Sequence, residues 1–427
     1  MRTRHAVSYT HLDVYKRQDK DRLLTAESAF LVCEGGKSAG VFRELPGRYR
    51  PLPLHDYSGR LILPGLVDLH VHAPQYSYRG LGMDLELLEW LETRTFPAEA
   101  KYQDLDYAKR LYAGFTEALV RGPNTRAAIF ATAHAPATLA LMDRLEASGL
   151  KTLVGKVNMD RNCPDSLRER DARASAAATV EWLEEWAAGA YENTAPIITP
   201  RFIPSCTDAL MEELGAIRRR YGLPVQSHLS ENLAEVEWVK ELRPDVSFYG
   251  EAYDRHGLFG KEARTIMAHC VYSGEAEIRL MRENGVYVAH CPQSNMNLAS
   301  GIAPVRRFLE EGLAVGLGSD VAGGSAMSIF RAMADAIQVS KLRWRLVDDS
   351  LKPLTVPEAF YLGTLGGGSF FGKVGGFAAG DELDALVLDD RGLNPEPLTI
   401  EERLERVIYL SDDRHIEKKF VAGRPIW

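Results

Sequence analysis

Histidine and acidic side chains recur at the ends of short apolar segments in this 427-residue sequence. His70 and His72 stand two positions apart at the end of segment 66–72, so in a β-strand both side chains point to the same face. His228 and Asp320 lie at the ends of two later apolar segments. Three imidazoles and one carboxylate are a suitable ligand set for a divalent metal such as zinc, and one coordination position would remain for water.

Two further residues, Glu231 and His269, could take part in the chemistry. Glu231 follows His228 by three positions, where the strand gives way to the next helix. An acidic residue in the first turn of a helix is ordinary, but beside a metal it could carry protons between water and substrate. His269 ends another apolar segment and is either a packed core histidine or an active-site residue. Asp320 has an alternative role as a helix cap. We favour the functional interpretation for all three.

Other candidates carry less weight. His134 and His290 also lie at segment ends, but with the metal set complete we expect them to support other groups or to pack in the core. Cys291 could be a nucleophile, yet we expect it to be structural, because no Cys–His pairing is evident that the metal set does not explain better. Trp90 and Phe96 are core residues by default, and one of them could roof a pocket.

Eight apolar segments alternate with helical patterns, which favours parallel pairing of the strands. Eight strands close a (β/α)8 barrel, and the chemistry of that fold gathers at the carboxyl ends of the strands. The sequence therefore predicts an α/β protein with a TIM-like barrel over residues 66–371. The expected strands are 66–72, 127–133, 151–157, 197–203, 223–229, 265–270, 286–291 and 314–320.

The two flanks of this barrel, residues 21–65 and 372–427, are too short for a robust core of their own. Both contain short strand patterns, including 384–388 and 407–410, so we predict that they pair into one small β domain. Residues 1–20 have no apolar stretch typical of a secretory signal, and SYTHLDVYKRQ resembles translated vector sequence. We treat these residues as a non-native leader and leave them out of the fold argument.

Composition excludes several classes of function. Lysine and arginine number 51 against 59 acidic residues, a net charge of −8 that gives no support for binding to nucleic acid or to anionic membranes. Five cysteines are too few, and odd in number, for a disulfide framework, so we expect a reducing cytoplasm. No apolar run approaches the roughly 18 residues of a membrane span.

The ordered motifs PGLVDLHVH, QSHLSEN, AHC and GLGSD resemble the amidohydrolase superfamily of metal-dependent barrels. Within it, the segments HAPQYSYRG, LLEWLETRTFPAE and RFIPSCTDALMEELG resemble the guanine deaminases, as does AHCPQSNMNLASG. The resemblance runs from about residue 23 to the end of the chain. It implies a zinc-dependent hydrolysis of guanine to xanthine and ammonia, in a homodimeric enzyme with one Zn²⁺ per chain. His and carboxylate ligands also suit Fe²⁺ or Mn²⁺.

Carried onto this sequence, the resemblance implies a role for each candidate. It assigns zinc binding to His70, His72, His228 and Asp320. Glu231 would be the proton shuttle, and His269 would orient water or substrate beside the metal. Gln75, Arg201 and Phe202 would hold the purine, and these types fit, because an arginine and an amide suit the polar edges of a planar base and a phenylalanine suits its face.

Three alternatives remain at this point. Loops set the substrate of such barrels, so a deaminase of another amino-heterocycle, such as a pterin, a triazine or an adenine derivative, is the nearest one. A non-catalytic barrel that serves as a scaffold is disfavoured, because the ligand set is complete. Binding to nucleic acid is disfavoured by the net charge of −8.

Overall fold

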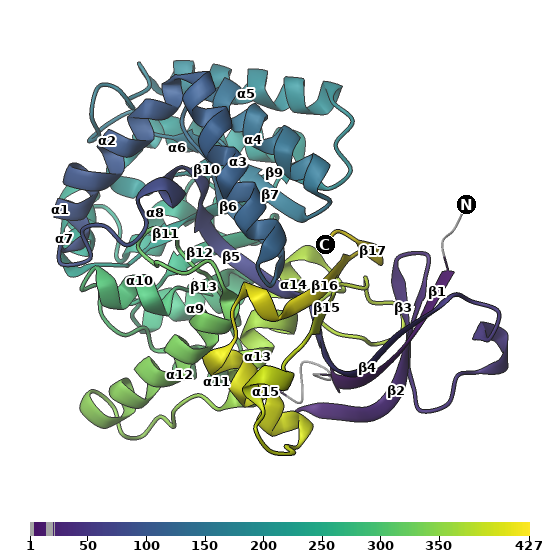
Figure 1. Cartoon of the computed structure of the whole chain (residues 1–427). Helices are drawn as coiled ribbons and strands as arrows, with labels where there is room; N and C mark the ends of the chain where they lie inside the picture. Colours follow the sequence, from purple (N-terminus) through teal and green to yellow (C-terminus); the bar gives the residue numbers. More distant parts are fainter. Residues whose placement is uncertain (1–3, 14–19, 21) are drawn as a thin grey trace.

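A barrel of parallel strands surrounded by helices makes up most of the computed structural model, which describes residues 4–13, 20 and 22–427 (Figure 1). Two four-stranded parallel sheets supply most of its wall. The barrel strands are β5 (Leu66–His72), β6 (Asn124–Phe130), β7 (Lys151–Gly155), β9 (Thr194–Pro196), β10 (Thr199–Pro200), β11 (Val225–Leu229), β12 (Thr265–His269), β13 (Tyr287–His290) and β14 (Ala314–Leu317).

The wall closes at two seams. At one, Ile198 forms a parallel bridge with Val225, which joins the fourth strand to β11. At the other, the Asp320 backbone N–H donates to the His70 carbonyl at 2.8 Å, so the end of β14 is tied to β5. The predicted (β/α)8 barrel is thereby confirmed. Its fourth strand is split into β9 and β10, and β10 pairs with the short β8 (Val157–Asn158); prolines in both pieces lack the N–H that a continuous ladder needs.

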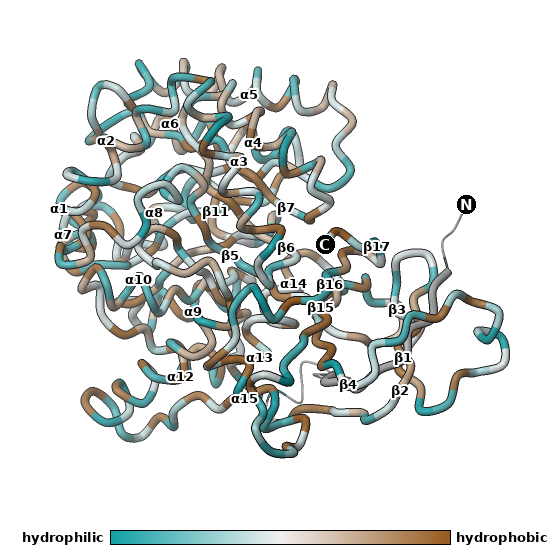
Figure 2. Tube along the Cα trace, in the orientation of Figure 1, coloured by the Kyte–Doolittle hydropathy of each residue, from teal (hydrophilic) through white to brown (hydrophobic). Residues whose placement is uncertain are grey.

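Helices cover the barrel, and hydrophilic and hydrophobic residues alternate along their turns (Figure 2). Many of their apolar side chains are buried in the core. Side chains of Asp104, Asp171 and Thr207 cap helix starts, and left-handed glycines such as Gly149 end others. The helices are α3 (Leu105–Arg121), α4 (Ala135–Ser148), α5 (Ala172–Ala188), α6 (Asp208–Tyr221), α7 (Leu233–Leu242), α8 (Tyr249–Asp254), α9 (Glu275–Asn284), α10 (Pro292–Asn297), α11 (Val305–Glu310), α12 (Ile329–Leu346), α13 (Val356–Tyr361) and α14 (Gly367–Phe371). Within the described residues, no helix is both long and apolar enough to cross a bilayer.

One helical segment between β5 and α3 does not follow the simple strand–helix alternation. It consists of α1 (Leu87–Trp90), a π-helical turn over 91–95 and α2 (Phe96–Glu99), and we refer to residues 87–99 as the covering segment. Two hydrogen bonds anchor it to the preceding loop, from Tyr78 Oη to Thr95 at 3.0 Å and from Trp90 Nε1 to the Leu81 carbonyl at 3.2 Å. A π-turn inside a helix is often found at functional sites.

Strands from both ends of the chain form a second, seven-stranded sheet, seen as the purple and yellow arrows of Figure 1. Its order is β17-β16-β15-β4-β1-β2-β3, and β15 runs antiparallel to β4 with Ala385 opposite Pro64. We propose this sheet as the core of the small domain. Its strands are β1 (Arg4–Asp13), β2 (Leu24–Glu34), β3 (Lys37–Phe42), β4 (Leu54–Pro64), β15 (Ala385–Leu388), β16 (Ile416–Val421) and β17 (Arg424–Pro425).

Residues 4–13, which the sequence argument left out, form β1, and this strand pairs with β2 and β4. One expectation about the flanks is wrong. Residues 407–410 belong to α15 (Ile400–Leu410) rather than to a strand. The buried side chains of α15 recur at spacings of four, three and one positions, and Thr399 opens the helix with a capping box. The four-residue run VIYL was too short to reveal that helical period.

A buried lysine joins the small sheet to the barrel. Lys419 on β16 is fully buried, and its Nζ donates to the carbonyls of Leu119 at 2.7 Å and Asn124 at 2.9 Å. Burial lowers the pKa of Lys419 to about 7. Beside it, Arg126 on β6 donates to the buried Asp384 carboxylate at 2.7 Å, so the two parts share polar as well as apolar contacts.

The lysine gives a pH-dependent contribution to stability. Above its folded-state pKa of about 7, Lys419 is neutral in the folded chain but still protonated when unfolded, so raising the pH towards 10 favours folding. Urea titrations would give the free energy of unfolding of the wild type and of Lys419→Met at each pH. The wild-type value minus the variant value should therefore rise between pH 7 and pH 10. Lys151→Met, which removes a more exposed lysine, is the control for the loss of a lysine side chain. A flat difference for Lys419→Met would contradict the assignment.

Candidate active site

Four side chains converge at the carboxyl ends of the barrel strands. His70 and His72 come from β5, His228 from β11, and Asp320 follows β14. His72 Nε2 lies 3.2 Å from Nε2 of both His70 and His228. Oδ1 of Asp320 lies 3.1 Å from His70 Nε2 and 3.4 Å from His72 Nε2. The structure thus brings together all four predicted ligands.

These distances fit a bound metal ion. Ligands at about 2.0 Å from a tetrahedral metal stand about 3.3 Å from one another, which matches the separations of 3.1 to 3.4 Å in this cluster. Imidazole nitrogens must be unprotonated to bind a metal, and burial lowers the pKa of His72 and His228 well below the usual value. The donor set and its spacing therefore suit a divalent cation such as zinc.

The backbone orients one of these ligands. Nδ1 of His228 donates to the carbonyl of Arg201 at 2.6 Å, so its Nε2 carries the lone pair and faces the other ligands. Asp68 holds the first strand in register with the last, because its carboxylate accepts from the backbone N–H of His70 at 3.2 Å and of Ser319 at 3.0 Å. Such supporting contacts fix ring orientation before a metal arrives.

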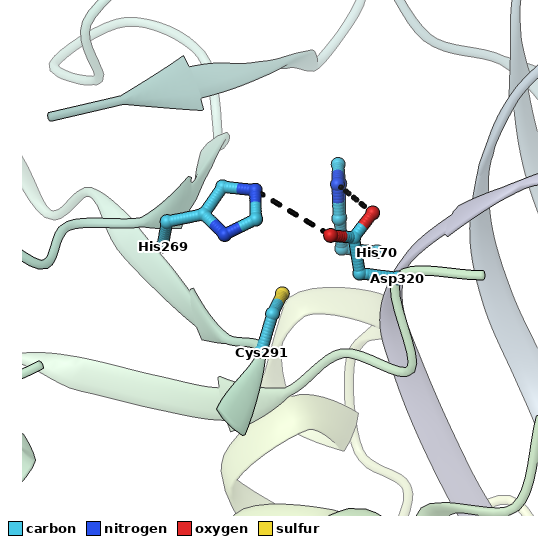
Figure 3. A group of neighbouring side chains, drawn as sticks. All are labelled: His70, His269, Cys291 and Asp320. Carbon is cyan, nitrogen blue, oxygen red and sulfur yellow. Dashed lines mark ion pairs between the residues drawn. The ribbon is translucent and has the colours of Figure 1, made fainter. Parts of the chain in front are cut away.

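Glu231 and His269 stand beside this cluster. His269 Nε2 lies 3.4 Å from Glu231 Oε2 and 3.8 Å from Asp320 Oδ2, and Figure 3 shows the ring pointing towards the aspartate. Nδ1 of His269 pairs with Oδ1 of Asn295 at 2.9 Å, which leaves Nε2 as an acceptor. Within the described part of the chain this buried Nε2 has no hydrogen-bond partner. An unpartnered buried nitrogen aimed into a cluster of acids is suited to a water or a substrate atom.

The pKa values of the two carboxylates of the site, Glu231 and Asp320, are shifted in opposite directions. Burial raises the pKa of Glu231 well above its usual value, and the neighbouring Asp320 adds to the effect. Burial acts in the same direction on Asp320, but His70 and the other imidazoles outweigh it and lower the pKa of this carboxyl. Paired acids whose pKa values are pushed apart are typical of acid–base catalysis. His269 and Asp320 also adopt left-handed φ values of 74° and 44°, a strain that clusters at functional sites.

A pocket opens onto the cluster at the carboxyl ends of the strands. Gln75, Arg201 and Phe202, the three predicted purine-binding residues, line it together with Glu231 and His269. Apolar side chains of the covering segment line one side of the pocket, and Trp90, one of the two aromatic residues considered for its roof, is among them. The other apolar lining residues are Leu87, Leu91 and Leu298.

Comparison with known proteins agrees with this geometry. The sequence profile of the amidohydrolase family matches residues 61–426. The chain belongs to the amidohydrolase family. Guanine deaminase of Dictyostelium discoideum is 38% identical over 87% of this amidohydrolase and 83% of its own length. Guanine deaminase of Escherichia coli is 32% identical over 100% of this chain and 98% of its own.

Solved structures give the same result for this amidohydrolase. A crystal structure of guanine deaminase from C. acetobutylicum, with bound guanine in the active site, superposes with a TM-score of 0.96 and 45% sequence identity. The match covers 100% of both chains. The likeness therefore extends over the whole amidohydrolase and includes both the barrel and the small sheet.

Sequence reasoning missed three polar residues of the amidohydrolase site. Glu99 accepts hydrogen bonds from Gln75 and Arg201. Glu235 also lines the cavity, and its Oε2 accepts from the backbone N–H of Glu231 at 2.9 Å. Asn295 orients His269. Glu235 stands three positions after Asn232 in a capping-box pattern, which the structure contains. Glu99 and Asn295 lie inside the motifs LLEWLETRTFPAE and AHCPQSNMNLASG, but the motifs alone gave neither residue a role.

Cys291 lies beneath the amidohydrolase cluster, with its thiol close to His70, His269 and Asp320 (Figure 3). Its Sγ donates to the Ala289 carbonyl at 3.4 Å. Burial raises the pKa of this thiol well above its usual value, so the side chain stays neutral. A neutral, fully buried thiol is a poor nucleophile, and we propose that Cys291 is a packing residue, as the sequence indicated.

Metal removal should lower the thermal stability of this amidohydrolase, since a metal that binds only the folded chain stabilises it by mass action. We expect the Tm of chelator-treated protein to rise by several degrees when Zn²⁺ is added. His72→Ala should abolish most of this increase. His134→Ala is the control, because its half-buried imidazole lies outside the ligand cluster. An equal increase in the wild type and His72→Ala would exclude the proposed ligand set.

Proposed function

We propose that this chain is a guanine deaminase that hydrolyses guanine to xanthine and ammonia. The observation that carries the proposal is one cavity that holds both the His–Asp cluster and three residues suited to a purine, namely Gln75, Arg201 and Phe202. The C. acetobutylicum guanine deaminase, 45% identical, supports it, because that enzyme has guanine bound in its active site.

The cavity offers what a planar heterocycle needs. Arg201 is fully enclosed and still has N–H groups to donate beyond those bound to Glu99. Gln75 has a second amide hydrogen and a second lone pair free for a base edge. Phe202 supplies an aromatic face, and the apolar covering segment excludes water. We propose that these three side chains position guanine with C2 towards the cluster.

The chain's own acids would move the protons. A divalent metal held by His70, His72, His228 and Asp320 would activate a water for attack at neutral pH. The water oxygen adds to C2 of guanine while Glu231, whose pKa is raised, gives a proton to N3. Of the two water protons, one replaces the proton that Glu231 gives to N3, and the other passes through Asp320 and Glu231 to the exocyclic nitrogen. The C2–N bond then breaks and ammonia leaves, so guanine and water become xanthine and ammonia.

His269 would hold the attacking water or the developing oxygen of the product, because its free Nε2 faces both carboxylates. We propose Zn²⁺ as the metal, one per chain, on the basis of three imidazoles and one carboxylate whose donor atoms lie 3.1 to 3.4 Å apart; Fe²⁺ and Mn²⁺ suit the same donors. We also propose a cytoplasmic homodimer that acts in purine metabolism. All five cysteines are free thiols, which fits a reducing compartment.

The test is product formation by zinc-loaded protein supplied with guanine. We expect xanthine and ammonia in equal amounts, and no product from protein stripped of metal. Release of ammonia without xanthine, or turnover that is unchanged after complete metal removal, would refute the proposed reaction.

A further inference from the structure

Glu99, the last residue of the covering segment, is bound to two of the proposed purine-binding residues at once. Its Oε1 accepts from Gln75 Nε2 at 3.0 Å and from an Arg201 amino group at 3.3 Å, and its Oε2 accepts from the other Arg201 amino group at 2.5 Å. Its side chain is 3% exposed and that of Arg201 is 4% exposed. A bidentate pair of this kind fixes both partners in one geometry.

The contacts of Glu99 belong to a longer chain of hydrogen bonds. Gln75 Oε1 accepts from the backbone N–H of Ala322 at 3.1 Å, just after Asp320. At the other end, the carbonyl of Arg201 accepts from Nδ1 of the metal ligand His228 at 2.6 Å. Glu99 therefore stands in the middle of a path that runs from the loop after β14 to the ligand on β11. A carboxylate only accepts hydrogen bonds, so Glu99 also determines which end of the Gln75 amide points towards it.

Glu99 also balances the charge of Arg201 inside the cavity. The covering segment shields this arginine from solvent, so an unpaired guanidinium there would attract an anion strongly. The buried guanidinium instead pairs with the Glu99 carboxylate through two of its N–H groups. The pair is neutral as a whole, which suits an uncharged heterocycle.

We propose that Glu99 is a positioning residue that orients Gln75 and Arg201 and cancels the charge of Arg201, so that the cavity favours the uncharged substrate over an anionic product. This rests on the proposed guanine deamination. Deamination replaces the amino group by a carbonyl, which leaves xanthine with an N–H between two carbonyls, and such an imide ionises more readily than guanine. A neutral Glu99–Arg201 pair releases that product, whereas an unpaired Arg201 would retain it.

The first test compares wild type with Glu99→Gln, which keeps the shape and removes the charge. We expect KM for guanine to rise about tenfold or more, because the orientation of two binding residues is lost, with a smaller change in kcat. The ratio of the inhibition constant of xanthine to KM for guanine should fall by at least about tenfold, which means stronger inhibition. This fall should be larger at pH 8 than at pH 6.5. Glu99→Asp, which restores the charge, should remove most of the added xanthine inhibition.

Glu358→Gln is the matched control. Glu358 is also a buried carboxylate in a bidentate pair, with Arg306 at 2.6 Å, but that pair lies between α11 and α13, away from the cavity. It should lower stability without changing KM or xanthine inhibition. Unchanged xanthine inhibition in Glu99→Gln, or an equal change in Glu358→Gln, would overturn the charge-balancing role.

A second measurement does not depend on the reaction. Because Glu99 ties the covering segment to Gln75 and Arg201, amide hydrogen exchange over residues 87–98 should be faster in Glu99→Gln than in the wild type without substrate. Exchange in α11 and α13 should be unaffected. If the wild type failed to deaminate guanine, the proposed function would be refuted. The exchange measurement would still test the positioning role of Glu99, because it needs no substrate. Unchanged exchange over residues 87–98 would contradict it.

Discussion

Glu231→Gln should lower kcat for guanine by about 10²- to 10⁴-fold while the protein still binds one metal ion per chain. Glutamine has the same shape but neither takes nor gives a proton at neutral pH. Glu231 is the group placed to protonate N3, because it is buried, has a raised pKa and lies 3.4 Å from His269. Steady-state kinetics with metal analysis of the same samples would measure both effects.

The control for this experiment is Glu277→Gln. Glu277 is likewise fully buried with a raised pKa, but it accepts from Ser230 Oγ at 3.0 Å and from the Gly250 backbone rather than lining the cavity. We expect its kcat to stay within a few-fold of the wild type. If Glu231→Gln retained the wild-type rate with a full complement of metal, Glu231 would have no part in proton transfer.

Arg201→Ala is the second change with a large expected effect. Each hydrogen bond from a charged donor contributes about 1.5–3 kcal/mol, or about 10- to 150-fold, so kcat/KM for guanine should fall by roughly 100-fold or more. The substitution also leaves Glu99 buried without its partner, which costs stability. Metal content should not change, because His228 bonds to the backbone carbonyl of Arg201 and not to its side chain. Kinetics, metal analysis and Tm would be measured together.

Two further variants separate binding from stability. Arg201→Lys keeps a positive charge opposite Glu99 but loses the planar fork, so we expect better stability than Arg201→Ala and little recovery of kcat/KM. Arg243→Ala removes another buried arginine, which pairs with Asp208 and Asp245 outside the cavity. It should lower stability only. Wild-type kcat/KM in Arg201→Ala would eliminate the side chain from guanine recognition.

Most of the metal cluster was predictable because three of its four residues lie on strands. A side chain at the end of a barrel strand has a fixed direction, so the spacing of His70 and His72 is enough to place both on the inner face. His228 lies on β11, and Asp320 follows the end of β14, so the barrel brings both to the same rim. Strand β5 even has the predicted bounds, Leu66–His72.

Residues that act through loops and tertiary contacts were not predictable in this way. Glu99 lies in a helical segment between strands, and no local spacing shows that its carboxylate meets Arg201, which is 102 positions later in the chain. Asn295 likewise reaches His269 only through the fold. In the C-terminal flank, the run 407–410 looked like a strand because four residues are fewer than two helical turns, and the helical period shows only over the whole of α15.

The central claim is that one cavity both binds guanine and activates water against it. The most direct test is kcat/KM for ammonia release by zinc-loaded protein, measured in parallel for guanine, adenine, cytosine, a pterin and a triazine. We predict a value for guanine at least about a hundredfold above each of the others, because the polar edge contacts of Gln75 and Arg201 reject bases that cannot pair with them. Faster turnover of any other compound, or none of guanine by metal-loaded protein, would contradict the account.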